Sequence, residues 1–549
     1  MILIVQFKFI SRSLMTSGIW RISSVLLAGM LLFPLVTMVG MALSAPGDAV
    51  SALWHALPVY GINSLMLVVG CVLFSLLFAL PLAWLMSRYR FAGQVWLHRA
   101  LLLPLAMPGY LLAAVYGDAL GYEGPVKQTL YALSFDTDIV PQTFWQQALM
   151  VVCASLCLAL VLFPYVYLLV RTALMSQPVS LQQAARLMNQ TRAQVFWRVV
   201  FPMARPAIAL GMVLMASEAL GDYGISAYFS LQTITTAGLD LWRDKAQHGT
   251  AALLMSLLLP LVFLIWFQAR RSRARQLRYQ KNSGVYPQNV PVLRGWPRFL
   301  VMLFGGALVV IAFVVPVGRL VGWAILSEAP IWSLPFLLAF TSSFMAAACA
   351  TLLVIGLAVV CTFDFRAIGN PAYRNPLRWL NLNRLLPSTA LGMGLLVPFL
   401  GLDAWHATAG GVVDDPWAGS VLVLILAYCM RFSGLLIDRL QIRMSRLSGA
   451  MNHVSQSLGY TPALQVLWVY LPQLRHCLIV GVLLVFTESL RELNASLLLQ
   501  PFEVETMATY VFRFMMDERL PLVATPALML VGVGMIPLFG ITRLMRMEG

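Results

Sequence analysis

Five ionisable residues lie at two equivalent places inside apolar segments of this 549-residue chain. Glu218 and Asp222 lie at the first place, and Glu488, Arg491 and Glu492 lie at the second. A spacing of four residues predicts that the two acids of each pair share one face of a helix. Ionisable groups inside membrane spans are costly, and their default interpretation is a substrate or ion path. Because hard cations prefer carboxylate oxygens, Glu218 and Glu488 are candidates for transient contact with a metal ion.

Two structural alternatives stand beside that hypothesis. In the first, Arg491 pairs with a neighbouring carboxylate and fixes the packing of the helix. In the second, Asp222 and Glu492 lie in solvent at the external surface. Glu218 and Glu488 remain the favoured path residues because they are deeper in their segments and correspond to one another at an offset of 270 residues.

The segments that carry these residues are predicted to span a membrane. Apolar residues make up 60% of the chain and charged residues 11%, against roughly 45–50% and 25% in soluble domains. The mean hydropathy is +0.81. Runs of about 20 apolar residues cross the hydrocarbon core. The sequence predicts an all-α polytopic membrane protein of about 12 spans, at 22–43, 62–87, 97–119, 147–170, 203–223, 250–268, 299–326, 336–362, 383–402, 418–438, 473–493 and 521–541.

The 270-residue offset predicts a duplicated half rather than a short repeat. Asn189 corresponds to Gly459, Pro202 to Pro472 and Thr236 to Thr506. The predicted divisions are a first half at 1–268, a linker at 269–298 and a second half at 299–549. Each half has an even number of spans, so both enter the membrane in the same direction, as a parallel repeat.

Positive charge predicts the orientation in the membrane. The linker is rich in Arg and carries no Asp or Glu, and Arg431, Arg439 and Arg443 precede the corresponding loop of the second half. Lys and Arg accumulate on the cytoplasmic side, so the linker and both termini are predicted to be cytoplasmic. These basic loops account for the net charge of +15, predict contact with membrane lipid and argue against a nucleic-acid partner.

One predicted cytoplasmic loop of each half, at 180–202 and at 450–472, reads as two short helices with a bend between them. Asn189 and Gly459 stand at the bends and are residue types that tolerate a left-handed conformation. Thr191 and Gln194 form a capping-box pattern at the start of the next helix. The candidate contact residues are Gln183, Ala184, Ala185, Leu187, Met188, Asn189 and Pro202 in the first loop, and Val454, Ser455, Leu458, Gly459 and Pro472 in the second.

These two loops resemble the EAA loop of ABC-importer permeases, which reads Glu-Ala-Ala, three residues, Gly, nine residues, and an apolar tail ending in Pro. The tails here end in Pro202 and Pro472, whereas Gln183 and His453 replace the acidic residue and Asn189 replaces the first Gly. The resemblance implies the type I ABC-importer fold in a bacterial inner membrane. It further implies two copies of a cytoplasmic ATPase docked on the two EAA-like loops, and a periplasmic substrate-binding protein.

The segment after the second acidic site resembles permeases for ferric iron, because it carries an acidic, Leu-rich run followed by Pro501-Phe502 and Thr506-Met507-Ala508. Thiamine permeases share the fused layout and the acidic Gly-Asp run, so thiamine remains an alternative cation. A different class, the ion-driven secondary transporter, would not need the EAA-like loops. No Gly-rich phosphate-binding loop with Lys and no nucleophile–base constellation is present. The chain is therefore predicted to be a permease with no bound cofactor, ATP being used by a partner subunit.

Overall fold

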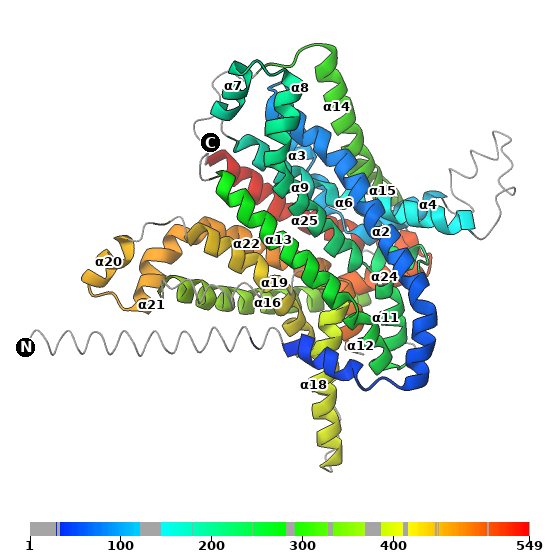
Figure 1. The fold of residues 1–549 in the computed structure, drawn as a ribbon. Coiled ribbons are helices and arrows are strands. Elements are labelled where there is room, and N and C mark those ends of the chain that lie inside the picture. Colours follow the sequence, from blue (N-terminus) through cyan, green and yellow to red (C-terminus); the bar gives the residue numbers. More distant parts are fainter. Residues whose placement is uncertain are drawn as a thin grey trace, which may run out of the picture.

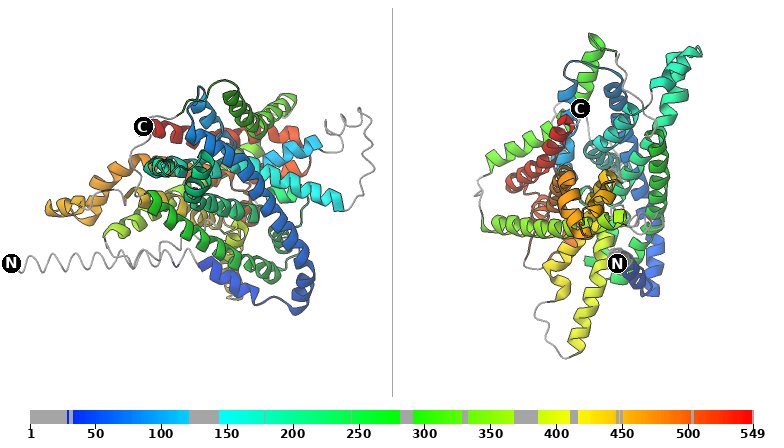
Figure 2. Two further views of the ribbon diagram at one scale, coloured as in Figure 1. Left: turned by 45° about the horizontal axis from the view of Figure 1, so that its top comes forward. Right: turned by 90° about the vertical axis from the view of Figure 1, so that its left-hand side faces the viewer.

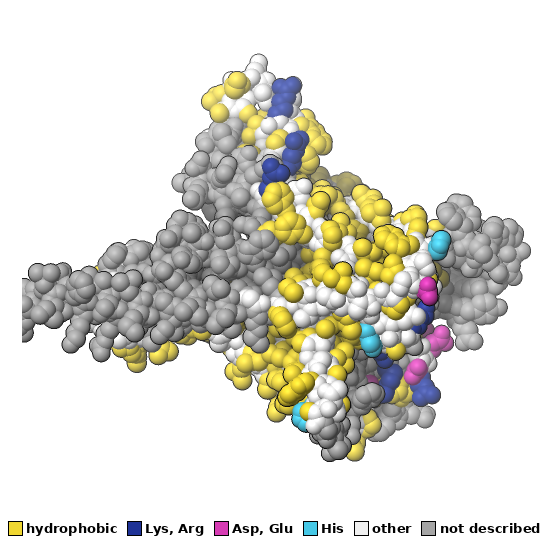
Figure 3. All heavy atoms as spheres, turned by 60° about the horizontal axis from the view of Figure 1, so that its bottom comes forward, with side chains coloured by type: hydrophobic (Ala, Val, Ile, Leu, Met, Phe, Trp, Pro, Cys, Tyr) yellow, Lys and Arg dark blue, Asp and Glu magenta, His cyan; other side chains and the backbone are white. Residues whose placement is uncertain are grey.

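The computed structural model describes residues 29, 33–120, 144–177, 179–243, 245–280, 291–327, 333–367, 386–409, 416–444, 447, 450–501 and 504–547. Within these residues the regular structure is helical (Figure 1), and the β-type pairing is an isolated bridge between Arg90 and Val292. The prediction of an all-α chain is confirmed. Hydrophobic side chains cover most of the coloured surface in Figure 3, which suits helices that face lipid.

Ten helical segments of the described chain are long and apolar enough to cross a membrane, and an eleventh results if one bent pair counts as a span. Of the predicted first span, 22–43, the structure describes a short apolar helix at Phe33–Ala42, and residues 1–28 lie outside the description. The other long helices are α2 (Gly47–Arg88), α6 (Phe144–Met175), α9 (Phe201–Leu220), α12 (His248–Ser256) with α13 (Leu258–Gln280), α14 (Trp296–Val309) with α15 (Val315–Leu326), α16 (Leu334–Ala367), α18 (Ser388–Thr408), α19 (Val421–Met444), α22 (Leu471–Arg491) and α25 (Leu520–Met547).

The predicted third span, 97–119, is broken rather than straight. It consists of α3 (Gln94–Ala100), the 3-10 turn η1 (Leu103–Ala106) and α4 (Gly109–Leu120), with a bend of 88° between its two parts. Pro104 and Pro108 explain the break, because proline donates no backbone hydrogen bond and disfavours helix in the residue before it. In the second half α18 likewise begins directly after Pro387.

The duplication is visible in the order and packing of the helices. The pairs that correspond are α7 (Val179–Leu187) and α20 (Ala450–Ser457), α8 (Arg192–Val195) and α21 (Pro462–Gln465), α9 and α22, α10 (Gly224–Tyr228) and α23 (Asn494–Leu499), and α11 (Ile234–Arg243) and α24 (Met507–Met516). Gly211 packs against Val166, and Gly481 packs against Leu436. Both members of this contact shift by 270 residues, so the register predicted from sequence also holds between neighbouring spans.

Beyond the fifth spans the register shifts by three residues. Thr233 immediately precedes α11, and its backbone N–H donates to Thr236 Oγ1 over 2.8 Å. Thr506 immediately precedes α24 and makes the same contact with Thr509 over 3.0 Å. Thr506 is therefore the counterpart of Thr233, and the predicted match of Thr236 with Thr506 is wrong. The physical reason is that α23 is one residue longer than α10 and the turn after it is also longer.

The two halves interlock through their first helices. Met38 and Ala42 of the short first helix are buried in a core shared with α18 of the second half, and the Thr37 hydroxyl donates to the Gly394 carbonyl. In the opposite direction, α14 contacts α2 and α3, and α15 contacts α4. The predicted boundary at 269–298 divides the repeats along the chain. In space, the first helix of each predicted half packs against the other half.

The predicted linker is partly helical, because α13 continues to Gln280. Its far end returns to the first half: the Arg90 backbone N–H donates to the Pro291 carbonyl over 3.1 Å, and Leu293 N–H donates to the Arg90 carbonyl over 2.8 Å. Nearby, the ring of Trp84 lies 4.5 Å from that of Phe196. The end of α2, the end of the linker and the loop at 180–202 therefore lie on one side of the bundle, as the distribution of positive charge predicted.

The two EAA-like loops project from separate parts of the molecule. In Figure 1, α7 and α8 lie at the top and α20 and α21 at the left, whereas α4 extends to the right and α18 to the bottom. The views of Figure 2 keep the same separation. The loops thus stand at the ends of the bundle opposite the outer ends of α4 and α18.

Candidate functional site

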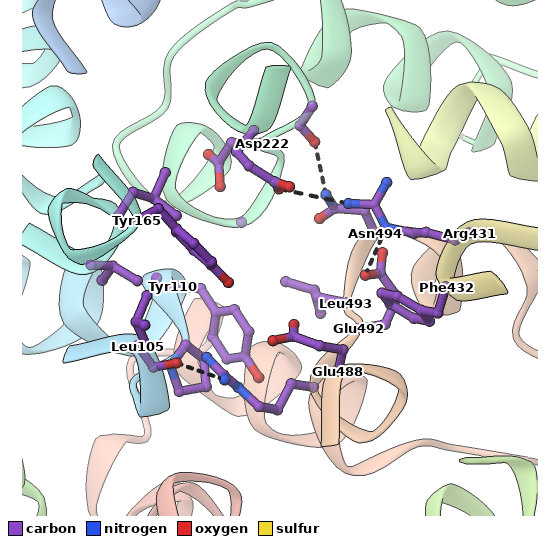
Figure 4. Close-up of a pocket in the computed structure, with 18 of the residues that line it drawn as sticks. Leu105, Tyr110, Tyr165, Asp222, Arg431, Phe432, Glu488, Glu492, Leu493 and Asn494 are labelled. Atoms are coloured by element: carbon purple, nitrogen blue, oxygen red, sulfur yellow. Dashed lines mark hydrogen bonds and ion pairs between the residues drawn. The ribbon is translucent and has the colours of Figure 1, made fainter. Parts of the chain in front are cut away.

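The predicted carboxylates meet in a cavity of about 240 Å³ between the two halves (Figure 4). Glu218 and Asp222 approach it from the end of α9, and Glu488 and Glu492 approach it from the end of α22. The lining repeats at the 270-residue offset, through Val161 and Arg431, Leu162 and Phe432, Tyr165 and Leu435, Glu218 and Glu488, Gly221 and Arg491, Asp222 and Glu492, and Gly224 and Asn494. The cavity therefore lies where the symmetry-related surfaces of the halves face one another.

The two acids of each pair do not share one continuous helix, so that prediction is wrong. Helix α9 ends at Leu220, and Asp222 lies beyond it, where its Oδ2 accepts hydrogen bonds from the Ser226 backbone N–H (3.0 Å) and hydroxyl (3.1 Å). Helix α22 ends at Arg491, and Glu492 is extended, with φ −69° and ψ 116°. An acid just before a short helix satisfies backbone N–H groups that would otherwise lack partners, which explains why the chain turns at these positions.

The cation that meets these carboxylates is Arg431 of α19. Its Nε lies 3.3 Å from Glu492 Oε2, and its Nη2 lies 3.8 Å from Glu218 Oε2. The sequence placed Arg431 among the cytoplasmic charges before the second loop. The structure instead places it within a span and buries it, with its side chain 14% exposed. An arginine ten or more residues inside an apolar segment was the signal that charge counting passed over.

Arg491 and Asn494 join the halves through backbone carbonyls. Arg491 donates to the Leu105 carbonyl over 2.9 Å, and Asn494 donates to the Gly221 carbonyl over 2.8 Å (Figure 4). Both acceptors belong to the first half and both donors to the second. The predicted pairing of Arg491 with a carboxylate is thus replaced, within the described residues, by a contact with the broken third span. That break leaves carbonyls free to accept, because the helix hydrogen bonds are interrupted there.

Within the described part of the chain, no three His, Cys, Asp or Glu side chains gather closely enough to hold a metal ion. The cavity carboxylates are spaced apart, and two of them, Glu218 and Glu492, are paired with Arg431. Glu218 is the more open member of the ion pairs, with its side chain 39% exposed, whereas Glu492 is 10% exposed. The arrangement places carboxylate oxygens from both halves and the guanidinium of Arg431 around one cavity.

The bends of the EAA-like loops have the predicted conformation. Asn189 has φ 62° and Gly459 has φ 79°, both in the left-handed region. The predicted capping box is also present: the Thr191 backbone N–H donates to Gln194 Oε1 (2.9 Å), and the Gln194 N–H donates to Thr191 Oγ1 (3.3 Å). In the second loop α21 begins at Pro462, the first helical position that suits proline.

Each loop joins its span through a single π-helical turn, η3 (Phe196–Val200) and η7 (Val466–Tyr470). These turns were not predicted from the sequence. Pro202 and Pro472 follow them at the same offset, and each proline removes one donor from the regular helical pattern. A wider turn of this kind is frequent at functional sites. In both halves, the proline of the motif therefore follows a π-helical turn.

The candidate contact residues of the loops divide into an outer and an inner group. Leu187 is 88% exposed, Met188 76% and Leu458 71%. Gln183, Ala184 and Val454 are also exposed, whereas the side chain of His453 lies outside the described residues. Ala185 is buried with Val195 and Val200, and Ser455 is buried as well. The inner group holds each loop against its own half and leaves the outer group facing away from the protein.

A polytopic helical bundle made of two interlocked repeats, with a charged cavity between them and a matching exposed loop on each, defines the membrane component of an importer. Residues 75–276 match the family of binding-protein-dependent transport system inner membrane components. The chain belongs to this family. It is thus a multi-pass inner-membrane permease that works with a separate ATPase and a substrate-binding protein, and it has no catalytic activity of its own.

The relatives differ in how much of the chain they cover. The chain is 26% identical to the Fe(3+)-transport system permease protein FbpB 2 of Haemophilus influenzae, over 87% of this chain and 88% of that protein. It is 33% identical to the molybdenum transport system permease protein ModB of Escherichia coli K12, over 37% of this chain and 90% of that protein. The corresponding ModB of Haemophilus influenzae is 29% identical, over 38% and 93%. The molybdenum permeases thus match a length close to one half of this chain, whereas the iron permease matches a length close to that of the two halves together.

Proposed function

We propose that this chain translocates ferric iron and that the metal passes the carboxylates of the central cavity. The observation that carries the proposal is the convergence of Glu218, Asp222, Glu488 and Glu492 from both halves on one cavity. A hard cation is matched by carboxylate oxygens, and a multivalent charge offsets the cost of several carboxylates away from bulk water.

The comparison with whole proteins supports iron over the other cargoes. The relative named for Fe(3+) transport covers 87% of the chain, a share too large to be supplied by either half alone. The relatives named for molybdenum transport cover 37–38%, too little to include both acidic sites. Thiamine, the alternative cation, carries a single permanent charge and would offset fewer carboxylates.

The coupling to ATP is proposed to run through the EAA-like loops. One ATPase copy would dock on each loop, with Leu187 and Met188 inserted on one side and Leu458 with Val454 on the other. The exposure of these apolar side chains supports the proposal, because large apolar groups that protrude from a loop outside the bilayer are typical of a binding surface. The linker, both loops and both termini would then be cytoplasmic.

The test is iron uptake by proteoliposomes that hold the permease, its ATPase and the binding protein. Glu218→Gln and Glu488→Gln should each reduce uptake about tenfold or more, because one hydrogen bond to a charged group contributes roughly 1.5–3 kcal/mol. The double variant should be much worse than either single variant if both carboxylates meet one ion.

Asp118→Asn is the matched control. Asp118 also pairs with an arginine of the other half, Arg319, over 3.0 Å, and it lies outside the cavity lining. Its amide should leave uptake unchanged. Normal iron uptake by the double glutamine variant, with the complex assembled, would remove both glutamates from the path.

A further inference from the structure

The carboxylates of the cavity are duplicated between the halves, but its arginines are not. Glu218 matches Glu488, and Asp222 matches the acidic Glu492. The three arginines that line the cavity all come from the second half. Their counterparts in the first half are uncharged: Val161 for Arg431, Leu169 for Arg439 and Gly221 for Arg491. The register of this comparison is secured by the equivalent packing of Gly211 on Val166 and Gly481 on Leu436.

Arg431 is anchored within its own half by two contacts. Its Nη1 donates to the Leu386 carbonyl over 2.9 Å, and its Nε lies 3.3 Å from Glu492. Leu386 precedes α18, and Glu492 follows α22. Both are part of the second half, so the guanidinium is fixed relative to that half.

A third contact of Arg431 crosses to the first half. Its Nη2 lies 3.8 Å from Glu218 Oε2. This contact is longer than the one to Glu492, and Glu218 is 39% exposed where Glu492 is 10% exposed. Because ion pairs in contact with water are screened more strongly than buried ones, the contact with Glu218 is the one that separates more easily. If the halves part, Arg431 moves with Glu492 and leaves Glu218.

We propose that Arg431 is a latch between the two halves: it holds Glu218 while no cation is present and must release it before the cavity opens. The proposal rests on the proposed function, in which Glu218 meets a passing cation. A multivalent cation that reaches the carboxylates takes over the neutralising role of the guanidinium at Glu218, so entry of the substrate and release of the latch favour one another. A latch of this kind requires unequal halves, which a single fused chain supplies.

The latch also predicts how ATP hydrolysis depends on the halves. In this structure the halves are joined at the cavity, while α7 and α20 project from separate parts of the bundle (Figure 1). The ATPase subunits that would dock there meet only when the halves rearrange. Arg431 therefore restrains the ATPase in the resting complex, and its removal is expected to raise hydrolysis in the absence of binding protein and iron.

The experiment measures that basal ATP hydrolysis in the reconstituted permease–ATPase complex. Arg431→Gln should raise it by roughly fivefold or more, the usual lower range for coupling between two sites. Glu218→Gln removes the same cross-half contact while leaving Arg431 paired with Glu492, so it should raise hydrolysis similarly. Arg319→Gln is the control, because it breaks another ion pair between the halves, with Asp118, outside the cavity.

If Arg431→Gln cannot be produced, Glu218→Gln still decides the question, because it leaves Arg431 and its contacts with Leu386 and Glu492 in place. Basal hydrolysis at the wild-type rate in an assembled Glu218→Gln complex would overturn the latch. Since no iron is present in the assay, this result is separate from whether iron is the substrate.

Discussion

At the scale of single residues, the left-handed bends at positions 189 and 459 differ in the substitutions that they tolerate. Gly459 has φ 79° and no atom within 4 Å of an added Cβ, so space is not the constraint and backbone conformation is. A residue with a Cβ in this region costs about 1–2 kcal/mol, and a β-branched one costs more because its side chain is stiff.

Gly459→Val is therefore expected to distort the second EAA-like loop and reduce recovery of the ATPase with the permease, while the permease still inserts into the membrane. Co-purification of the two subunits measures this effect. Asn189→Gly is the matched control in the first loop and should retain the ATPase, because glycine adopts the observed φ of 62° freely. Equal recovery of the ATPase by both variants would contradict the role assigned to the bend.

In the cavity, contacts with neighbouring residues decide the conformation of a short motif whose spacing alone suggested another. The four-residue spacing of Glu218 and Asp222 predicted a common helix face, but the side chain of Asp222 accepts from Ser226 and belongs to the next turn. Both acids still reach the cavity. They do so from a helix end and a following turn, which places four carboxylates around one space rather than two on each of two helix faces.

At the scale of helices, α18 and the short first helix of the other half approach closely at Gly394. A Cβ on Gly394 would collide with the Pro34 carbonyl oxygen, a backbone atom that cannot rotate away. Gly394→Ala should therefore displace the first helix and lower the stability of the permease by about 1–3 kcal/mol, the usual cost of overpacking. The melting temperature of the detergent-solubilised protein is the measurement.

Gly401→Ala is the control on the same helix. No atom lies within 4 Å of a Cβ added there, so the change should be neutral or slightly stabilising, because alanine favours a helix over glycine. If the Gly394→Ala and Gly401→Ala proteins have the same melting temperature, the first helix does not pack where the structure places it.

At the scale of the whole molecule, the basic linker and the contacts that hold it predict the orientation in the membrane. Arg271 is exposed within α13, and Thr408 is exposed at the end of α18. In intact cells with the native cysteines replaced, a membrane-impermeant thiol reagent should label a cysteine substituted for Thr408 and miss one substituted for Arg271. The reverse pattern would invert the topology and place both EAA-like loops on the side that has no ATP.

Much of this structure could be predicted from the types and spacing of neighbouring residues. The apolar runs predicted helices, because a backbone in lipid must satisfy its own hydrogen bonds. The offset between Glu218 and Glu488 predicted two halves, and residue type at positions 189 and 459 predicted a left-handed bend. Each of these predictions depends on a few neighbouring residues or on a repeat in the sequence. Both kinds of pattern can be recognised from the order of residues along the chain.

Tertiary structure alone decided which groups meet. The depth of Arg431 in its apolar segment is readable from the sequence, but Arg431 lies far from Glu218 along the chain. Its place between two carboxylates therefore depends on how α19 packs against α22 and on how the two halves meet. The exchange of first helices likewise depends on contacts between segments hundreds of residues apart, such as Thr37 with Gly394. Residue pattern determines the conformation of each segment, whereas the pairing of charges across the halves arises only when buried side chains must find partners in the assembled bundle.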